Sequence, residues 1–394
     1  MRHSTDRILV SHAGNLPRPD DVNTLLANKD STGFSRRLPT AVNDIVDRQV
    51  ELGVDIVNDG EYVKAGSYTG YMLERVTGWE SLPITRPPKR AGVGERDRRE
   101  FPGVYESGLW LSGSGGPVRP GFSAPGRPTT PQTERVCTGP VKYTAHAQIK
   151  SDTEYLKAAL AGKDGVDGFV AALGPLSLGG GQHNEYYPSE EAYMQAVAEA
   201  VHDEYKAITD AGLIVQIDEP NFATAWMFYP DYSVAEYRKL LEFYVEIINH
   251  ALRGLPEDQV RFHVCWGSGH RPHVNDIEFK HIADLMLKIN AQSYSVEAGN
   301  VRHAHEWQVW KDVKLPDGKI LMPGVISHAT DLVEHPDLVA ERLINFASVV
   351  GKENLQTGTD CGIGSRVGHE EIVWAKLKTM SEGARRASHV LWGM

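Results

Sequence analysis

Short runs rich in β-branched and other apolar residues recur along this chain, and each is followed by a segment with helical periodicity. The runs cover residues 8–14, 54–61, 168–175, 213–220, 261–267, 291–298, 319–327 and 355–362. Strands that alternate with helices are typical of parallel α/β folds, and eight such units can close into a barrel. The pattern therefore predicts an α/β protein with one (β/α)8 TIM barrel over residues 1–394.

One of the intervening helices can be placed in detail. Ser189 is a residue type that caps helix N-termini, and Gly212 is a type that ends helices. Between them, large side chains recur at intervals of four: Tyr193, Val197, Val201 and Tyr205. We expect a helix from Ser189 to Gly212 that buries this face.

Residues 81–135 interrupt the alternation because they are crowded with Pro, Gly and Arg. We assign a ninth strand candidate, residues 141–149, to the same excursion, so the insertion after the second strand covers about 81–150. Loops that follow barrel strands leave the barrel at its carboxyl end. The insertion therefore suits a lid, a contact within a homo-oligomer, or a disordered insert.

Composition excludes several kinds of partner. The net charge is −11 and no stripe of Lys and Arg occurs, so we expect neither nucleic acid nor an anionic membrane as a partner. No run approaches the roughly 20 apolar residues of a membrane span, and the N-terminus does not resemble a signal peptide. We expect a cytoplasmic protein.

Three widely spaced cysteines, Cys137, Cys265 and Cys361, are a poor basis for disulfides and are available to bind a metal.

Polar residues gather at the carboxyl ends of the runs, which meet at one mouth of a barrel. His263 and Cys265 are two residues apart in the run RFHVCWG and would project from the same face of a strand. Zn²⁺ favours four ligands drawn from thiolate, imidazole and carboxylate groups, whereas Mg²⁺ and Ca²⁺ do not favour thiolates. The sequence therefore predicts a zinc site made of His263, Cys265, Glu297 and Cys361.

Other interpretations of these residues stay open. Taken one at a time, His263, Cys265 and Cys361 are better explained as buried core residues, and only the barrel geometry favours the joint site. A rival metal set could also be composed from a group of histidines further along the chain: His270, His273, His281, His303 and His305. We expect most of that group to lie in loops or on helix surfaces.

An ordered series of motifs extends over nearly the whole chain: AGNLPRP, NDGE, QIDEP, HVCWG, SVEA, PGVISH and GTDCGIGSR. The series resembles the cobalamin-independent methionine synthases and their single-barrel relatives, which include the epoxyalkane:coenzyme M transferases. The resemblance implies that this chain corresponds to the C-terminal catalytic barrel of the two-barrel synthase. It would then lack the N-terminal half that helps to hold the folate donor.

The resemblance also implies roles for individual residues. His263, Cys265, Glu297 and Cys361 would bind the catalytic zinc, and Glu61 and Asp218 would hold the amino group of homocysteine. Asn15 stands where the family uses a Ser to help bind the amino acid. His328 lies close to the family's proton-transfer His, and we add Asp360 as a second candidate acid.

The expected function is zinc-dependent transfer of a methyl or related alkyl group to a thiol, with homocysteine giving methionine and a methylated folate as one candidate donor. Coordination to zinc deprotonates a thiol that would otherwise be mostly protonated at neutral pH. Four aromatic residues could stack on a flat donor or simply pack in loops: Tyr186, Tyr187, Trp226 and Phe228.

Three alternatives to this expected function remain. An epoxyalkane:coenzyme M transferase would need a cation for the sulfonate, for which Arg18, Arg75 or Arg366 are available. A zinc hydrolase would activate water instead of a thiol, although two thiolates reduce the Lewis acidity of the metal. A non-catalytic zinc-binding barrel would have four closed ligands and no exchangeable position.

Overall fold

The computed structural model describes residues 1–64, 69–92, 94–106, 133–267, 271–364 and 366–393. Its centre is an eight-stranded sheet in the order β1-β11-β10-β9-β8-β7-β5-β2, parallel in every pairing. The strands are β1 (Leu9–Val10), β2 (Ile56–Val57), β5 (Asp167–Leu173), β7 (Ile214–Asp218), β8 (Val260–Val264), β9 (Ser293–Val296), β10 (Ile320–Ile326) and β11 (Gln356–Thr359). The N–H of Asp55 donates to the carbonyl of Val10 at 2.8 Å, which joins the two end strands. The predicted (β/α)8 TIM barrel is confirmed.

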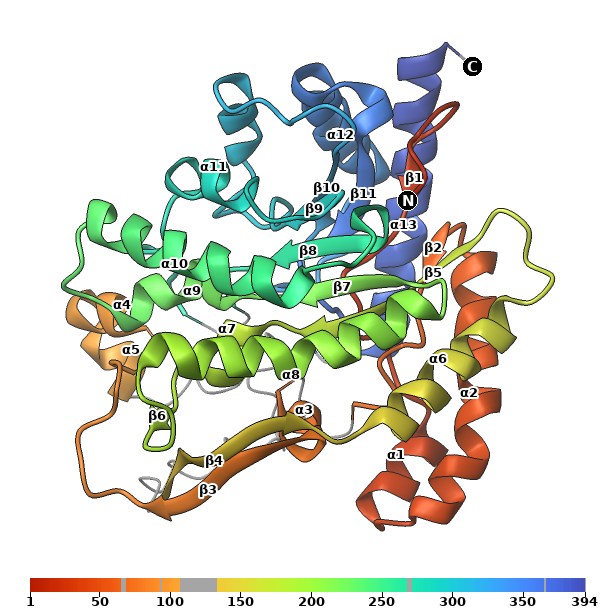
Figure 1. The fold of residues 1–394 in the computed structure, drawn as a ribbon. Helices are drawn as coiled ribbons and strands as arrows, with labels where there is room; N and C mark the ends of the chain where they lie inside the picture. The colour runs from red at the N-terminus through yellow and green to blue at the C-terminus, as the bar shows by residue number, and fades with distance from the viewer. Residues whose placement is uncertain (65–68, 93, 107–132, 268–270, 365, 394) are drawn as a thin grey trace.

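Helices surround the strands (Figure 1). The longer ones are α2 (Ser31–Glu51), α6 (His146–Leu160), α8 (Glu190–Asp210), α10 (Val234–Leu252), α12 (Pro336–Val350) and α13 (Glu370–Trp392). Shorter segments include α1 (Asp20–Ala27), α3 (Gly70–Arg75), α7 (Pro175–Gly179), α9 (Asn221–Phe228), α11 (Ala283–Met286) and the 3-10 helix η4 (Glu306–Lys311). None of the described helices combines the length and the apolar character that crossing a membrane requires.

The α8 helix confirms the prediction made for residues 189–212. The Ser189 hydroxyl accepts a hydrogen bond from the N–H of Ala192 at 3.1 Å, and Gly212 has a φ of +80° just after the helix. The four side chains at intervals of four are fully buried: Tyr193, Val197, Val201 and Tyr205. This buried face holds α8 against the strands.

The excursion after β2 contains a second sheet. Strand β3 (Val76–Pro83) pairs antiparallel with β4 (Thr133–Tyr143), and β4 pairs parallel with β6 (His183–Asn184). The strand expected at 141–149 is wrong beyond Tyr143, because α6 begins at His146. Ile149 and Leu156 of α6 are buried at helical spacing, which makes this segment a helix of the barrel. Residues 107–132 of the predicted insertion lie outside the described residues.

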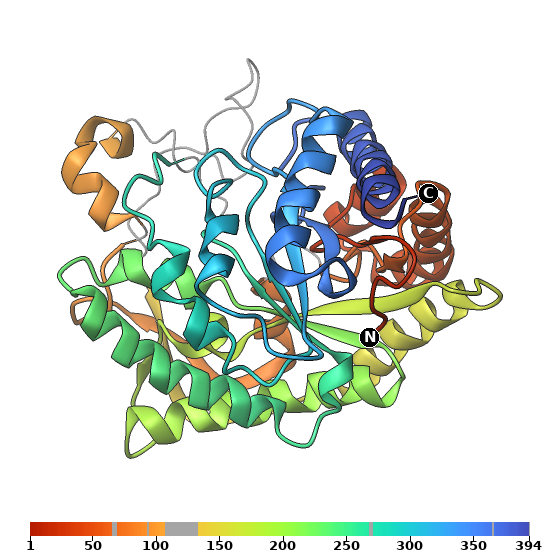
Figure 2. The ribbon, with the colours of Figure 1, turned by 90° about the horizontal axis from the view of Figure 1, so that it is seen from above.

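The described part of the insertion lies against the loops that follow β7 and β8. The helices α4 (Glu95–Glu100) and α5 (Pro102–Glu106) lie near α9 and α10 in Figures 1 and 2. The Arg96 guanidinium stacks 3.3 Å above the Trp226 ring and donates to the Trp226 carbonyl at 2.9 Å. The buried Asp97 carboxylate accepts from the backbone N–H groups of His273 and Asn275. The insertion is therefore fastened to the carboxyl side of the barrel.

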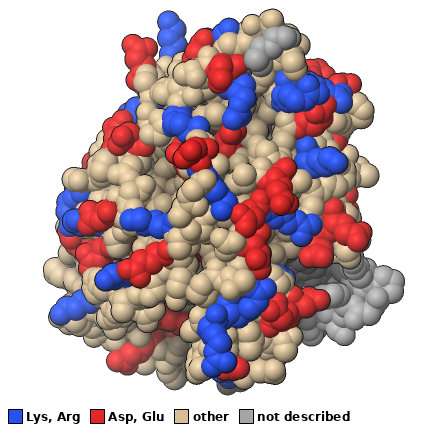
Figure 3. Space-filling view, turned by 90° about the vertical axis from the view of Figure 1, so that its right-hand side faces the viewer, with Lys and Arg blue, Asp and Glu red and all other residues tan. Residues whose placement is uncertain are grey.

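The face shown in Figure 3 carries Lys and Arg interspersed with Asp and Glu. Mixed charge of this kind is ordinary for a protein surface.

Candidate metal centre

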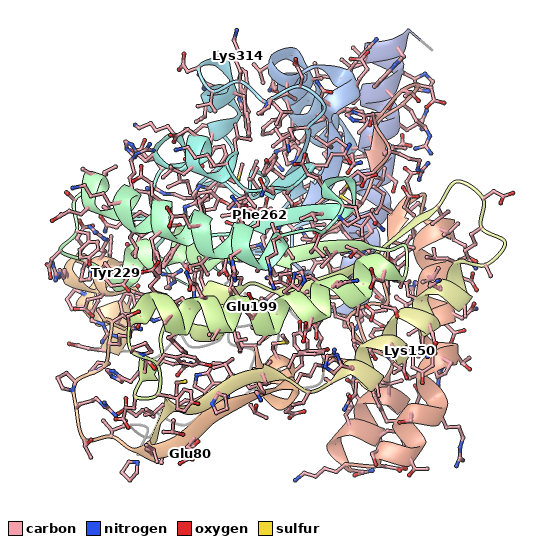
Figure 4. The ribbon with its side chains drawn as sticks, viewed as in Figure 1. Glu80, Lys150, Glu199, Tyr229, Phe262 and Lys314 are labelled. Atoms are coloured by element: carbon pink, nitrogen blue, oxygen red, sulfur yellow. The ribbon has the colours of Figure 1, made fainter. Side chains whose placement is uncertain are left out.

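Three of the predicted ligands come together at the carboxyl ends of β8 and β11. The ligand atoms of His263, Cys265 and Cys361 all lie within 4.8 Å of one another. Phe262, labelled on β8 in Figure 4, packs instead against Phe222 of α9, with ring centroids 5.6 Å apart. Because neighbouring strand residues point to opposite sides, His263 faces the barrel mouth while Phe262 faces the helices.

The His263 ring is held by a neighbouring strand. Its Nδ1 lies 2.8 Å from the Ser295 hydroxyl oxygen on β9, and its Nε2 is buried and makes no hydrogen bond of normal geometry among the described residues. If Nδ1 donates to Ser295, Nε2 keeps a lone pair for a metal. An imidazole beside two sulfur atoms fits Zn²⁺ better than a hard cation.

The two cysteines share their electrostatic environment. The pKa of Cys361 is held well below its ordinary value, first by its hydrogen bond with Cys265 and then, against the effect of burial, by His263 and His328. The same hydrogen bond, together with burial, raises the pKa of Cys265 well above its ordinary value. Cys361 is therefore the sulfur that ionises more readily, and Cys265 keeps its proton to higher pH.

Glu297 lies outside the three-ligand cluster. Its Oε1 is 3.8 Å from His328 Nδ1, and both of these buried atoms make no hydrogen bond among the described residues. Burial and the nearby Asp360 raise the pKa of Glu297 well above its ordinary value. Glu297 as a fourth ligand stays a prediction, and the structure places it beside the predicted proton-transfer residue.

Asp360 holds the turn after β9. Its Oδ1 accepts from the N–H groups of Ala298 at 2.9 Å and Gly299 at 2.6 Å, and its Oδ2 accepts from the Asn300 amide at 3.2 Å. Three donors fix the position of this carboxylate. These contacts make Asp360 a support for the loop that carries Glu297, and its role as an acid stays a prediction.

The predicted substrate-binding residues lie beside the metal centre. The N–H of Asn15 donates to Glu61 Oε1 at 2.6 Å, and Asp218 pairs in register with His263 across β7 and β8. Gln216 donates to Asp218 Oδ1 at 2.8 Å, and burial raises the pKa of Asp218 to about 7. The structure thus brings Asn15, Glu61 and Asp218 to one side of the mouth.

A fourth residue at this place was not expected from the sequence. Lys64 Nζ lies 3.2 Å from Glu61 Oε2, and both side chains are buried. Glu61 has a φ of +59°, and a Cβ on Gly14 would lie 2.1 Å from Glu61 Oε1. The Lys three residues after the Glu in NDGEYVK was the available signal, but the pattern does not show that the backbone turns back there.

The aromatic residues considered for donor binding have other contacts. Arg96 covers the Trp226 ring, and Arg90 lies 3.9 Å above the Phe228 ring. The Tyr187 hydroxyl accepts from the N–H of Val141, whereas Tyr186 is 52% exposed. Trp226, Phe228 and Tyr187 therefore act as packing residues in this structure.

Two of the rival histidines, His273 and His303, form ion pairs with carboxylates. His303 Nδ1 lies 2.7 Å from Glu306, and His273 Nδ1 lies 2.7 Å from Asp276. Burial lowers the pKa of His303, but its two carboxylate neighbours more than offset this and raise it to about 10. His303 also stacks on Trp266, the residue after Cys265, with centroids 4.2 Å apart. His270 lies outside the described residues, and within them only the His263 cluster has metal-ligand geometry.

Comparison with known proteins identifies the family of the chain. The model of the cobalamin-independent synthase catalytic domain matches residues 135–386. The methionine synthase of Pyrococcus abyssi is 24% identical over 217 residues, which is 55% of this chain and 56% of that protein. The methionine synthase of Pyrococcus horikoshii is 24% identical over 212 residues, 54% of each chain. The chain thus matches about half the length of these curated relatives.

Two solved structures share the fold. A B12-independent methionine synthase from Shewanella sp. W3-18-1, solved with selenomethionine, has a TM-score of 0.67 at 21% identity and covers 98% of this chain and 100% of its own. The proposed vitamin-B12 independent methionine synthase of Listeria monocytogenes has a TM-score of 0.65 at 19% identity, with 100% of both chains covered. With the motif series, the barrel and the domain match taken together, this chain belongs to the family of the cobalamin-independent synthase catalytic domain.

Proposed function

We propose that this protein is a zinc-dependent transferase that moves a methyl or related alkyl group onto a thiol. The observation that carries the proposal is the cluster of one imidazole and two cysteine sulfurs, all within 4.8 Å, at the carboxyl end of the barrel. Active sites of this fold lie at that end. The family makes homocysteine the first acceptor to consider and a methylated folate one candidate donor.

His263, Cys265 and Cys361 would hold Zn²⁺. When bound, Zn²⁺ lowers the pKa of a substrate thiol so that the thiolate is available at neutral pH. Three protein ligands leave a fourth position for substrate sulfur, provided that Glu297 does not fill it permanently.

The chain's own residues would orient the acceptor and handle the proton. The acceptor sulfur forms a bond to the alkyl carbon as the bond from that carbon to the donor breaks, and the donor atom keeps the electron pair. A poor leaving group needs a proton at that moment. We assign this proton transfer to His328, whose Nδ1 lies 3.8 Å from Glu297 Oε1. Asp360 would keep the Glu297 loop in place through its three hydrogen bonds.

The alternative function, an epoxyalkane:coenzyme M transferase, loses one of its three candidate cations for the sulfonate. Arg75 is buried and paired with Asp152 at 2.6 Å and Glu204 at 3.1 Å, so it is not available to a sulfonate. Arg18 and Arg366 remain as cations near the mouth, since Arg18 interacts electrostatically with Glu61 and Arg366 with His328.

The test is zinc content and zinc-edge X-ray absorption with and without added thiol. Cys361→Ser should lose most of the bound zinc, whereas Cys137→Ser, on β4 of the second sheet, should keep it. A thiol acceptor should raise the number of sulfur atoms around zinc by one. Zinc that never gains a sulfur would favour a hydrolase or a non-catalytic zinc-binding barrel, and a protein without zinc would refute the ligand assignment.

A further inference from the structure

We propose that Lys64 occupies the place that the ammonium group of an amino-acid thiol would take, so that the acceptor is a thiol without an amino group. The inference rests on the proposed function, alkyl transfer to a thiol at the metal centre. It replaces homocysteine as the first acceptor with thiols that are neutral or anionic.

The surroundings of the Lys64 ammonium are those of a bound amine. Nζ lies 3.2 Å from Glu61 Oε2 and 5.0 Å from the centre of the Tyr71 ring. The Lys64 and Glu61 side chains are only 6% and 7% exposed. Burial lowers the pKa of Lys64, but Glu61, Asp218 and Asp59 more than offset this, so Lys64 is charged. Carboxylates and an aromatic face are the groups that would bind a substrate ammonium.

The backbone is arranged to bring this cation to the carboxylates. The N–H of Lys64 donates to the Glu61 carbonyl at 3.0 Å, which closes a turn over residues 61–64, and Glu61 itself has a φ of +59°. A side chain at positive φ is strained and persists when the surrounding contacts hold it. The N–H of Asn15 fixes the other carboxylate oxygen of Glu61 at 2.6 Å. Neither Glu61 oxygen is therefore left without a partner.

The charges near the metal centre disfavour a second ammonium. Asp218, which pairs in register with His263, interacts electrostatically with Lys64 as well as with Glu61 and His263, so the Lys64 cation acts on the carboxylate next to the candidate metal ligands. Arg18 is a further cation that interacts with Glu61. An incoming ammonium would meet like charge in a buried place, where repulsion is poorly screened, or would have to break the Lys64–Glu61 ion pair. A thiol without an amino group meets neither obstacle.

A matched pair of thiols tests the inference by isothermal titration of the zinc-loaded protein. Homocysteine and 4-mercaptobutyrate share the same carbon chain and carboxylate, and only homocysteine has the amino group. We expect 4-mercaptobutyrate to bind at least tenfold more tightly. Zinc-edge absorption on the same samples would show that the bound thiol's sulfur reaches the metal.

Variants test whether Lys64 causes the preference for the thiol that has no amino group. Lys64→Met keeps the length of the side chain but removes its charge, so it should reduce the preference for 4-mercaptobutyrate over homocysteine at least tenfold. Lys64→Arg keeps the charge and should keep this preference. Lys150→Met is the control, because Lys150 is 76% exposed on α6 (Figure 4) and should not affect either thiol.

Each outcome bears on one part of the inference. Equal or tighter binding of homocysteine by the wild-type protein, with its sulfur on zinc, would overturn the inference and leave the proposed function standing. An unchanged preference in a folded Lys64→Met variant would overturn the role of Lys64. If neither thiol adds a sulfur to the zinc shell, the proposed function fails for these acceptors and the inference fails with it.

Discussion

The hydrogen bond between Ser295 and His263 offers a sharp test of the metal centre. Ser295 lies on β9 and its hydroxyl is 2.8 Å from His263 Nδ1. We expect Ser295→Ala to weaken zinc binding because His263 loses the partner that fixes its ring and its tautomer. Outer partners of this kind typically contribute a factor of about 10 to 100 in metal affinity. That range corresponds to about 1.4–2.7 kcal/mol, slightly above the ~1 kcal/mol of an ordinary hydrogen bond.

The same strand supplies a matched control. Ser293 lies two residues earlier on β9, is also fully buried, and its hydroxyl makes no hydrogen bond among the described residues. Ser293→Ala therefore removes the same atom without touching His263. Zinc affinity would be measured by competition with a chelator at fixed pH. Equal affinities for the two variants would refute the argument that Ser295 orients the ligand.

Two further predictions concern stability and pH. Arg75→Met should destabilise the fold by about 3–5 kcal/mol, because it leaves the buried carboxylates of Asp152 and Glu204 without their cation; a chemical denaturation midpoint close to that of the wild type would contradict this. Zinc affinity should rise with pH, because the proton that Cys265 retains beside Cys361 must leave when both sulfurs bind. Calorimetry in buffers of different ionisation enthalpy should show at least one proton released per zinc, and a binding enthalpy that is the same in all buffers would exclude it.

The alternation of strands and helices was readable from the sequence because it depends on local periodicity. All eight predicted runs overlap a barrel strand, and the cap and buried face of α8 lie where the pattern placed them. The excursion after β2 was harder to predict from the sequence. Its strand β4 pairs with β3, which lies far away in sequence, and local periodicity does not show such a pairing. The residues after Tyr143 are apolar enough for either element, and burial against the barrel decides that α6 begins at His146.

The sequence by itself determined the fold and three members of the candidate metal cluster, since parallel strands in a barrel must bring their carboxyl ends together. Which groups contact one another at that mouth was decided by the tertiary structure. Glu297 lies beside His328 and outside the three-ligand cluster, and Asp360 is engaged by backbone donors. Lys64 reaches Glu61 through a turn over residues 61–64, next to the positive φ at Glu61. Such contacts depend on backbone angles and on distances of a few ångström between loops, which residue type and spacing do not specify.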